Sequence, residues 1–401
     1  MLFYMILNFR SPLLALVLAG VVTGFTGAHA APFVPSDDSV VLERLPSRPA
    51  DPVQRELRGL RAELAADPRD HERAAALARR YFDLAMAAGD PRYVGYAEAA
   101  LQQWKPGAAP GPVLLARGLL RQYRHDFDTA LADLARALEI DPQDTDARAW
   151  RAAIFMVRAD YAAAQRECKA LAGRASELLF AGCAAYLGAT TGATRDAYAQ
   201  LSAALARAPR AGPGQRQWTL TRLAEMADRL GDAPAAERHF RDALALDVTD
   251  NFLLAAYADF LLARNRPREV VALLKDWSRS DTLLLRLALA EKLLDSPRAA
   301  QYEAALAARF SDAAQRGERL HLQEEARYAL HLRGDARRAL ELAAENWKVQ
   351  REPRDALILI EAALAAKNPR AAQPVLDWLA ASRFEDPRLA RLAADVQALA
   401  R

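Results

Sequence analysis

The stretch GPVLLARGLLRQYRHDFDTALADLARALEIDP, residues 111–142, carries two amphipathic patterns in succession. In each pattern apolar residues recur every three to four positions, which is typical of a helix with one buried face. The dipeptide His125-Asp126 lies between the two patterns, where Asp is favoured as a helix cap. Small residues at Gly118 and Ala130 allow two helices to approach closely. The stretch therefore predicts an antiparallel pair of short helices.

The same arrangement recurs along most of the chain. Thr145 opens a second copy 34 residues after Gly111, and Gln217 and Asn251 open two more copies that are also 34 residues apart. Another clear copy begins at Leu320. Weaker copies span about residues 71–104, 178–205, 281–310 and 354–379, which brings the total to eight or nine pairs. Such a recurrence predicts a stack in which each pair buries its apolar face against its neighbours.

This period, with its order of small and large side chains, resembles the tetratricopeptide repeat (TPR) family over roughly residues 69–380. The resemblance implies an all-α fold, a right-handed superhelical solenoid of antiparallel helix pairs. It also implies that the chain binds other proteins. The composition agrees with a helical fold, because aromatic residues make up only 7% of the chain and the 52% of hydrophobic residues are mostly Ala and Leu.

The sequence divides into six segments. We expect a signal peptide at residues 1–30, a Pro-rich extended lead at 31–55 and repeats at 56–207. A loop rich in Pro and Gly at 208–216 would separate these repeats from a second set at 217–380. A C-terminal capping helix at 381–401 would cover the open end of the array.

The N-terminus has the three parts of a secretory signal. Arg10 precedes an apolar run at residues 13–22, and Ala28-His29-Ala30 forms a small-residue cleavage site. We expect cleavage after Ala30, a periplasmic or secreted protein, and no stable membrane insertion after cleavage. The alternative is an uncleaved membrane anchor, because apolar residues also precede Arg10.

Cys168 and Cys183 are the only cysteines in the sequence. An oxidising compartment would permit a disulfide between them, and two buried free thiols are the alternative. Two sulfurs without histidines at matched spacing cannot complete a tetrahedral metal shell, so no metal site is predicted.

Charge and motifs argue against nucleic-acid binding and catalysis. The chain has 54 basic and 51 acidic residues, a near-balance that gives no reason to expect a nucleic-acid partner. Phosphate-binding loops, dinucleotide fingerprints, and Cys-x-x-Cys, Gly-x-Ser-x-Gly and His-Glu-x-x-His motifs are absent from the sequence. We therefore predict that the chain is not an enzyme and needs no cofactor.

The resemblance to TPR proteins also implies where a partner would bind. The first helix of each pair would line a concave face, with certain register positions directed into the groove. Carried onto this sequence, these positions combine aromatic side chains with charges of both signs. The alternative for Trp218 and Tyr328 is that they pack between helices. The predicted partner-binding residues are Tyr123, Trp218, Arg222, Glu225, Asp228, Arg229, Asp259, Glu324, Tyr328 and His331.

Three functional hypotheses follow from these expectations. The first is a non-catalytic scaffold or adaptor of the bacterial cell envelope that binds a protein or peptide in the concave groove. The second is a structural subunit or self-associating assembly factor that uses its convex face or its ends. The third is an envelope hydrolase, which would need converging carboxylates such as Glu225, Asp228 and Asp259.

Overall fold

The computed structural model describes residues 51–248 and 250–401, except for the side chain of Pro106. All regular secondary structure in these residues is helical, which confirms the all-α prediction. The predicted signal peptide, its cleavage site after Ala30 and most of the Pro-rich lead lie outside the described residues. None of the described helices has the length and apolarity needed to cross a membrane.

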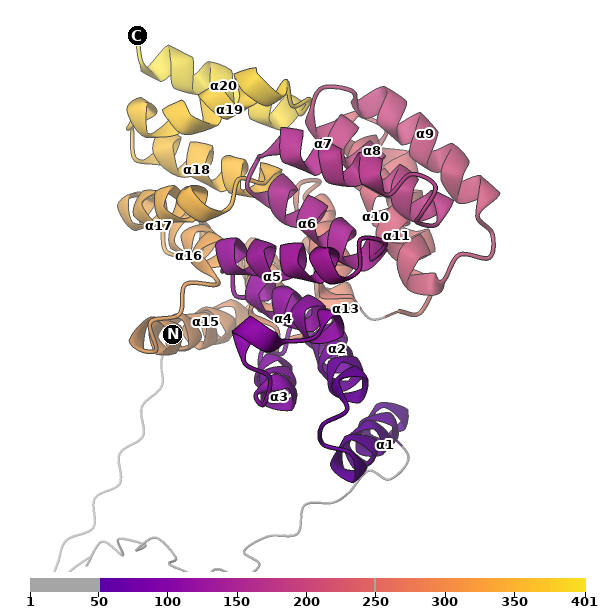
Figure 1. Ribbon diagram of the computed structural model, residues 1–401. Coiled ribbons are helices and arrows are strands. Elements are labelled where there is room, and N and C mark those ends of the chain that lie inside the picture. The colour runs from indigo at the N-terminus through magenta and orange to yellow at the C-terminus, as the bar shows by residue number, and fades with distance from the viewer. Residues whose placement is uncertain (1–50, 249) are drawn as a thin grey trace, which may run out of the picture. The chain divides into compact units, whose positions relative to one another are not determined.

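The helices follow one another through the described region, joined by short turns (Figure 1). They are α1 (Pro52–Ala66), α2 (His71–Ala88), α3 (Arg92–Leu101), α4 (Gly111–Tyr123), α5 (Phe127–Ile140), α6 (Thr145–Val157), α7 (Tyr161–Ala170), α8 (Glu177–Thr190), α9 (Thr194–Arg207), α10 (Pro213–Arg229), α11 (Ala233–Leu244), α12 (Asn251–Leu262), α13 (Pro267–Leu274), α14 (Asp281–Leu293), α15 (Arg298–Gln315), α16 (Leu322–Arg327), α17 (Ala336–Val349), α18 (Pro353–Ala365), α19 (Gln373–Ser382) and α20 (Pro387–Leu399). Short helical turns of other types are η1 (Pro106–Ala108), η2 (Tyr328–Leu332) and η3 (Pro369–Ala372).

Consecutive helices form pairs that stack on their neighbours. For example, α4 packs against α5 and α6 against α7, and the first helices α4 and α6 also touch each other. Helices α4, α6 and α12 begin at Gly111, Thr145 and Asn251, the positions predicted from the 34-residue spacing. The buried side chains form separate clusters along the described chain instead of one central core.

One boundary differs from the prediction at the Pro/Gly segment 208–216. The loop ends at Gly212, because Pro213 already forms the first turn of α10 and extends this helix upstream of Gln217. Proline is favoured at the first helical position, where its missing N–H leaves no hydrogen bond unmade. Part of the predicted loop is therefore the start of a helix.

Aspartates begin the second helix of several pairs. Asp160, Asp232 and Asp335 stand at the N-caps of α7, α11 and α17, and their carboxylates accept hydrogen bonds from backbone N–H groups three residues later. This bond satisfies one of the N–H groups that a helix start leaves unpaired. Asp126 occupies the same position in α5 but its side chain makes no capping bond. The cap predicted at His125-Asp126 is therefore present in position only.

Close packing within a pair depends on small side chains. An added Cβ at Gly118 would lie 2.8 Å from Cγ of Leu134, across the contact between α4 and α5. Leu134 is fully buried, as is Ala130 one turn before it. The two helices therefore approach as closely as they do because residue 118 has no side chain.

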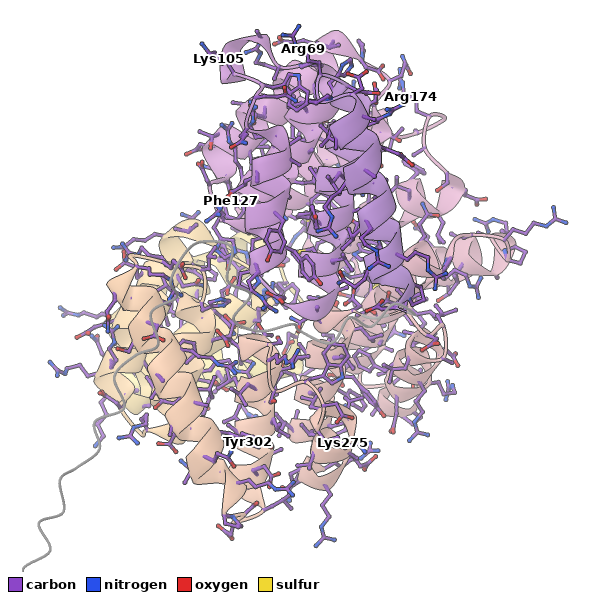
Figure 2. The ribbon with its side chains drawn as sticks, turned by 90° about the horizontal axis from the view of Figure 1, so that it is seen from below. Arg69, Lys105, Phe127, Arg174, Lys275 and Tyr302 are labelled. Carbon is purple, nitrogen blue, oxygen red and sulfur yellow. A yellow bond between two sulfur atoms is a disulfide. The ribbon has the colours of Figure 1, made fainter. Side chains whose placement is uncertain are left out.

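The C-terminal pairs lie against pairs from the first half of the array, far from them in sequence (Figure 1). The Arg351 N–H donates to the Val157 carbonyl at 2.8 Å, and the Trp378 indole N–H donates to the Tyr161 hydroxyl at 2.7 Å. Figure 2 shows Phe127 at the boundary between the N-terminal and the C-terminal helices. Three further contacts of this kind join His125 with Gln350, Tyr186 with Glu352, and Thr194 with Glu385. We call these five hydrogen bonds the closure contacts.

Candidate functional site

A cavity of about 800 Å³ lies among helices α8, α10, α12, α14, α18 and α20. We call it the inner cavity, because most of its wall comes from first helices of successive pairs. Its polar wall contains seven arginines and five carboxylates, and aromatic rings from α8, α11, α12 and the segment before α20 complete it. The charged residues are Arg222, Glu225, Asp228, Arg229, Asp259, Arg264, Arg286, Glu352, Arg354, Asp386, Arg388 and Arg391.

The inner cavity brings together half of the residues predicted to bind a partner. Arg222, Glu225, Asp228 and Arg229 reach it from α10, and Asp259 reaches it from α12. The four α10 residues share the inward face of one helix, since three to four residues make one turn. Whether these residues bind a partner stays a prediction.

Two predicted aromatic residues lie outside the inner cavity. Trp218 on α10 packs over Gly182 of α8, where an added Cβ would lie 2.6 Å from its ring, and Trp218 remains 37% exposed. Tyr328 packs against Phe310 with 5.5 Å between ring centroids, at the π-helical turn η2. Both rings thus pack against neighbouring helices.

The other three predicted residues are also placed elsewhere. Tyr123 packs on the N-terminal hydrophobic cluster. Glu324 accepts a hydrogen bond from the Thr282 hydroxyl at 3.4 Å. His331 lies 3.3 Å from the Glu361 carboxylate. The structure therefore does not gather all ten predicted residues into one groove.

Arg222 lies among aromatic rings at the wall of the inner cavity. The carbon at the centre of its guanidinium is 4.4 Å from the Tyr186 ring centroid, 4.6 Å from that of Phe252 and 5.5 Å from that of Trp218. Its Nη1 donates to Glu225 at 2.9 Å. The Nε of Arg222 is buried and has no hydrogen-bond partner among the described residues. Cation–π contacts therefore hold this guanidinium in place while leaving donor capacity unused.

Arg229 occupies the same face of α10 two turns later. Its guanidinium stacks 4.5 Å from the Phe384 ring centroid, and Nη1 donates to the Ala189 carbonyl at 3.0 Å. In the described part of the chain, the contacts of Arg229 include no ion pair with a carboxylate. Burial lowers its pKa, but arginine still remains protonated at neutral pH.

Asp259 forms a charged cluster with two arginines. Arg286 donates to Asp259 at 2.6 Å and Arg327 donates to it at 2.9 Å. Burial alone would raise the pKa of Asp259, but the two guanidinium groups lower it well below its usual range. The side chain of Arg286 is only 3% exposed, whereas Asp259 is 37% exposed toward the cavity. The ionised carboxylate therefore compensates a buried cation.

A second charged cluster stands at the start of α18. Arg354 pairs with Glu352 at 2.5 Å, and the Tyr186 hydroxyl donates to Glu352 at 3.3 Å. Asp355 accepts from the Asn346 side-chain amide at 2.9 Å. Burial, together with the nearby Glu352 carboxylate, raises the pKa of Asp355 to about 7.

Sequence reasoning missed the contribution of α18 and α20 to the cavity. Phe384, Arg388 and Arg391 belong to the segment that was expected only to cap the array. The charges of Glu352-Pro-Arg-Asp355, at the N-cap and first turn of α18, are the local sequence signal for this contribution.

The carboxylates suggested for a hydrolase do not form an acid–base pair. Glu225 is bound by Arg222, Asp228 by Arg264, and Asp259 by Arg286 and Arg327. A catalytic pair needs carboxyl groups whose environments push their pKa values apart near a reacting bond. Within residues 51–248 and 250–401, no group of three or more His, Cys, Asp or Glu side chains could hold a metal ion.

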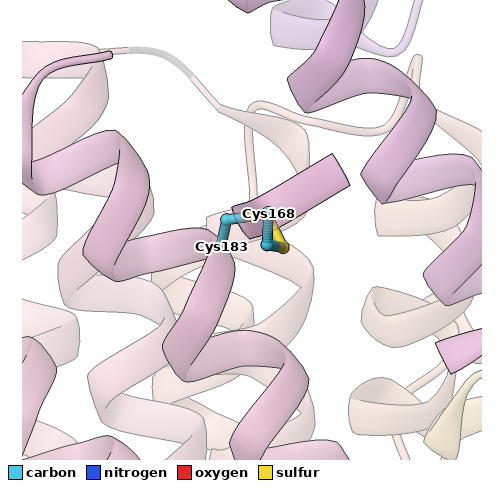
Figure 3. Close-up of a disulfide and its surroundings, with 2 residues drawn as sticks. All are labelled: Cys168 and Cys183. Carbon is cyan, nitrogen blue, oxygen red and sulfur yellow. A yellow bond between two sulfur atoms is a disulfide. The ribbon is translucent and has the colours of Figure 1, made fainter. Parts of the chain in front are cut away.

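The structure contains a disulfide between Cys168 and Cys183, with 5.5 Å between the Cα atoms (Figure 3). Cys168 lies in α7 and Cys183 in α8, so the bond joins one helix pair to the next. Cys168 is buried.

Comparisons with known proteins found distant likenesses among solved structures. No family model and no curated protein matches the chain. Solved structures similar to it include the APC/C hetero-tetramer Cut9-Hcn1 (14% identity, 86% of this chain and 73% of that chain, TM-score 0.47), yeast Tom70 (12%, 87% and 85%, 0.41) and the P58(IPK) TPR domain (15%, 82% and 94%, 0.21). The likeness in each case is distant, so the description of the fold stands on the helix pairs and their 34-residue spacing.

The fold is TPR-like. In this TPR-like array the first helices α8, α10, α12, α14 and α18 line the inner cavity, and the C-terminal helix α20 adds a further wall to it.

Proposed function

We propose that this TPR-like array is a non-catalytic scaffold that binds an extended segment of a partner protein in the inner cavity. The observation that carries the proposal is the cavity itself, with a volume of about 800 Å³ and a wall of aromatic rings and charged groups. Ligand sites in proteins usually measure about 300–1,000 Å³. This volume accommodates a few residues of a peptide but not a folded domain.

The scaffold is further proposed to act in the bacterial cell envelope. The charged, apolar and small-residue parts of residues 1–30 follow the order of an export signal. The disulfide between Cys168 and Cys183 supports this location, because disulfides persist mainly in oxidising compartments such as the periplasm.

Site-specific photo-crosslinking tests the proposal. A photoreactive phenylalanine analogue replaces Leu357, which lines the inner cavity, and in a matched control it replaces Arg238, an exposed residue of the outer helix α11. The proposal expects a discrete adduct with an envelope protein from position 357 and none from position 238, with the crosslinked peptide of the partner identified by mass spectrometry. An adduct confined to position 238, or none at either, would contradict it.

Self-association remains the alternative hypothesis. Large apolar side chains are exposed at Met86, Ile140 and Leu293, which belong to different helices. Light scattering at several protein concentrations separates the two ideas, since a persistent monomer argues against an assembly built from copies of this chain.

A further inference from the structure

Two arginines on one face of α10 line the inner cavity. Arg222 and Arg229 are seven residues apart on α10 and both line the cavity. Seven residues correspond to about two helical turns, and a rise of 1.5 Å per residue separates them by about 10 Å along the helix. The cavity wall therefore presents two cationic groups at a defined spacing.

The existing contacts leave both guanidinium groups incompletely satisfied. The buried Nε of Arg222 has no partner among the described residues, although Nη1 is bound to Glu225. Arg229 donates to one backbone carbonyl, that of Ala189, and to no carboxylate in the described region. An incoming carboxylate would supply the counter-ion that Arg229 lacks, through a charge-assisted hydrogen bond. The seven arginines of the wall also exceed its five carboxylates.

Aromatic rings hold the two arginines in place before any ligand arrives. Tyr186 and Phe252 stack on Arg222, and Phe384 stacks on Arg229. Side chains that are already ordered lose less conformational entropy on binding. Their planar guanidinium groups match the geometry of a carboxylate, which can accept two parallel hydrogen bonds.

Resting on the proposed function, we infer that the bound partner segment is acidic and adopts a polyproline II conformation, with two carboxylates three residues apart, one for Arg222 and one for Arg229. In a polyproline II conformation three residues make one turn and span about 9 Å, so side chains three residues apart lie on the same side at close to the spacing of the two arginines. Glu225 lies between them on the same helix face and repels a carboxylate placed midway. The preferred pattern is thus acid-x-x-acid with uncharged residues at both x positions.

Short fluorescein-labelled peptides on a Ser/Gly background test this pattern with the purified chain. The first carries two Glu residues three positions apart, the second carries them in adjacent positions, and the third has Gln in place of both. Fluorescence anisotropy should give the lowest Kd for the first peptide, about 10-fold weaker binding for the second and no saturable binding for the third. Equal affinities for the first two peptides, or for the first and third, would overturn the inference.

Variants assign the contact to named arginines. Arg229→Gln should raise the Kd of the first peptide about 10-fold. Arg391→Gln changes an exposed residue at the cavity rim and should raise this Kd about 2- to 3-fold. The control Arg238→Gln removes an exposed arginine from α11 and should change nothing. Circular dichroism reports on folding, and the Arg391 variant keeps the test valid if Arg229→Gln unfolds the chain. An unchanged Kd in the Arg391 variant and in a folded Arg229 variant would contradict the inference.

A competition experiment separates peptide carboxylates from free anions. Millimolar inorganic phosphate should leave the first peptide bound, whereas displacement without any preference for peptide spacing would indicate a general anion site and overturn the inference. If crosslinking from position 357 succeeds while the peptides fail, the acidic pattern is wrong and the scaffold function stands. If crosslinking fails as well, the scaffold function itself falls.

Discussion

The imidazole of His125 and the side-chain amide of Gln350 share a hydrogen bond of 2.7 Å, although 225 residues separate them in the sequence. His125 occupies the turn between α4 and α5 with a positive φ of 59°, and Gln350 follows α17. The next residue, Arg351, donates its N–H to Val157. These bonds connect early pairs of the array to late ones, so the stability of this fold depends on contacts that a linear stack of repeats lacks.

Acid should weaken the contact at His125. Burial, the largest effect, lowers the pKa of His125 from 6.5 to about 4. The unfolded chain therefore binds a proton near pH 6.5 and the folded chain only near pH 4, so stability contributed by the neutral ring is complete above 6.5 and is lost between 6.5 and 4. We expect a loss of about 1–2 kcal/mol, because the ring is partly exposed.

Urea unfolding at a series of pH values measures this loss. His125→Gln, which keeps a hydrogen-bonding side chain opposite Gln350, should show a shallower fall over the same window. The pKa of Asp355 is raised, so its contribution to stability increases as the pH falls, and it does so equally in both proteins. The difference between the two pH profiles therefore isolates the contribution of His125. Identical pH profiles would contradict the role given to this ring.

Removing the carboxylate of Asp259 should destabilise the fold. Asp259→Asn leaves Arg286, only 3% exposed, and Arg327 without their counter-ion. Loss of one partner from a buried ion pair costs about 3–5 kcal/mol, and we expect about 2–3 kcal/mol because Asp259 is 37% exposed. Asp228→Asn is the matched control, since Asp228 is equally exposed and pairs with the more exposed Arg264. In chemical denaturation, Asp228→Asn should lower the free energy of unfolding by less than about 1 kcal/mol.

The disulfide should contribute measurably to stability. Cys168 and Cys183 are 15 residues apart, and a loop of this length corresponds to about 3 kcal/mol in the chain-entropy model. Replacing both cysteines with Ala should lower the free energy of unfolding by about that amount. A reducing agent should destabilise the native chain and leave the double variant unchanged, whereas equal sensitivity of the two would rule out a bond between these cysteines.

A methyl group at Gly118 should disturb the pair formed by α4 and α5. An added Cβ would lie 2.8 Å from the buried Leu134, so Gly118→Ala should cost about 1–3 kcal/mol through overpacking. Gly95→Ala in α3 is the control, because nothing lies within 4 Å of its added Cβ. There the better helix propensity of Ala should stabilise the chain by about 0.5–1 kcal/mol. Thermal unfolding compares the two variants, and a stabilising effect at residue 118 would refute the close approach.

The positions of residues within the repeat correctly predicted some side chains of the cavity wall. Other side chains predicted in the same way lie outside the cavity. Arg222 and Asp259 reach the inner cavity from α10 and α12 as their positions in the repeat suggested. Tyr328 occupies a comparable register position but packs on Phe310 instead. A register position states which side of a helix a residue occupies, whereas the facing helices decide whether that side borders a cavity.

The sequence by itself determined the helix pairs, the starts of helices such as α4, α6 and α12, and the turns between them, because these depend on residues at most 34 positions apart. Apolar periodicity, small residues such as Gly118, and helix-breaking prolines act locally or between adjacent pairs. Only the tertiary structure decided that Gln350 meets His125 and that Phe384 stacks on Arg229. Such contacts depend on the summed rotation of many pairs, and small rotations that no single repeat encodes add up over the array.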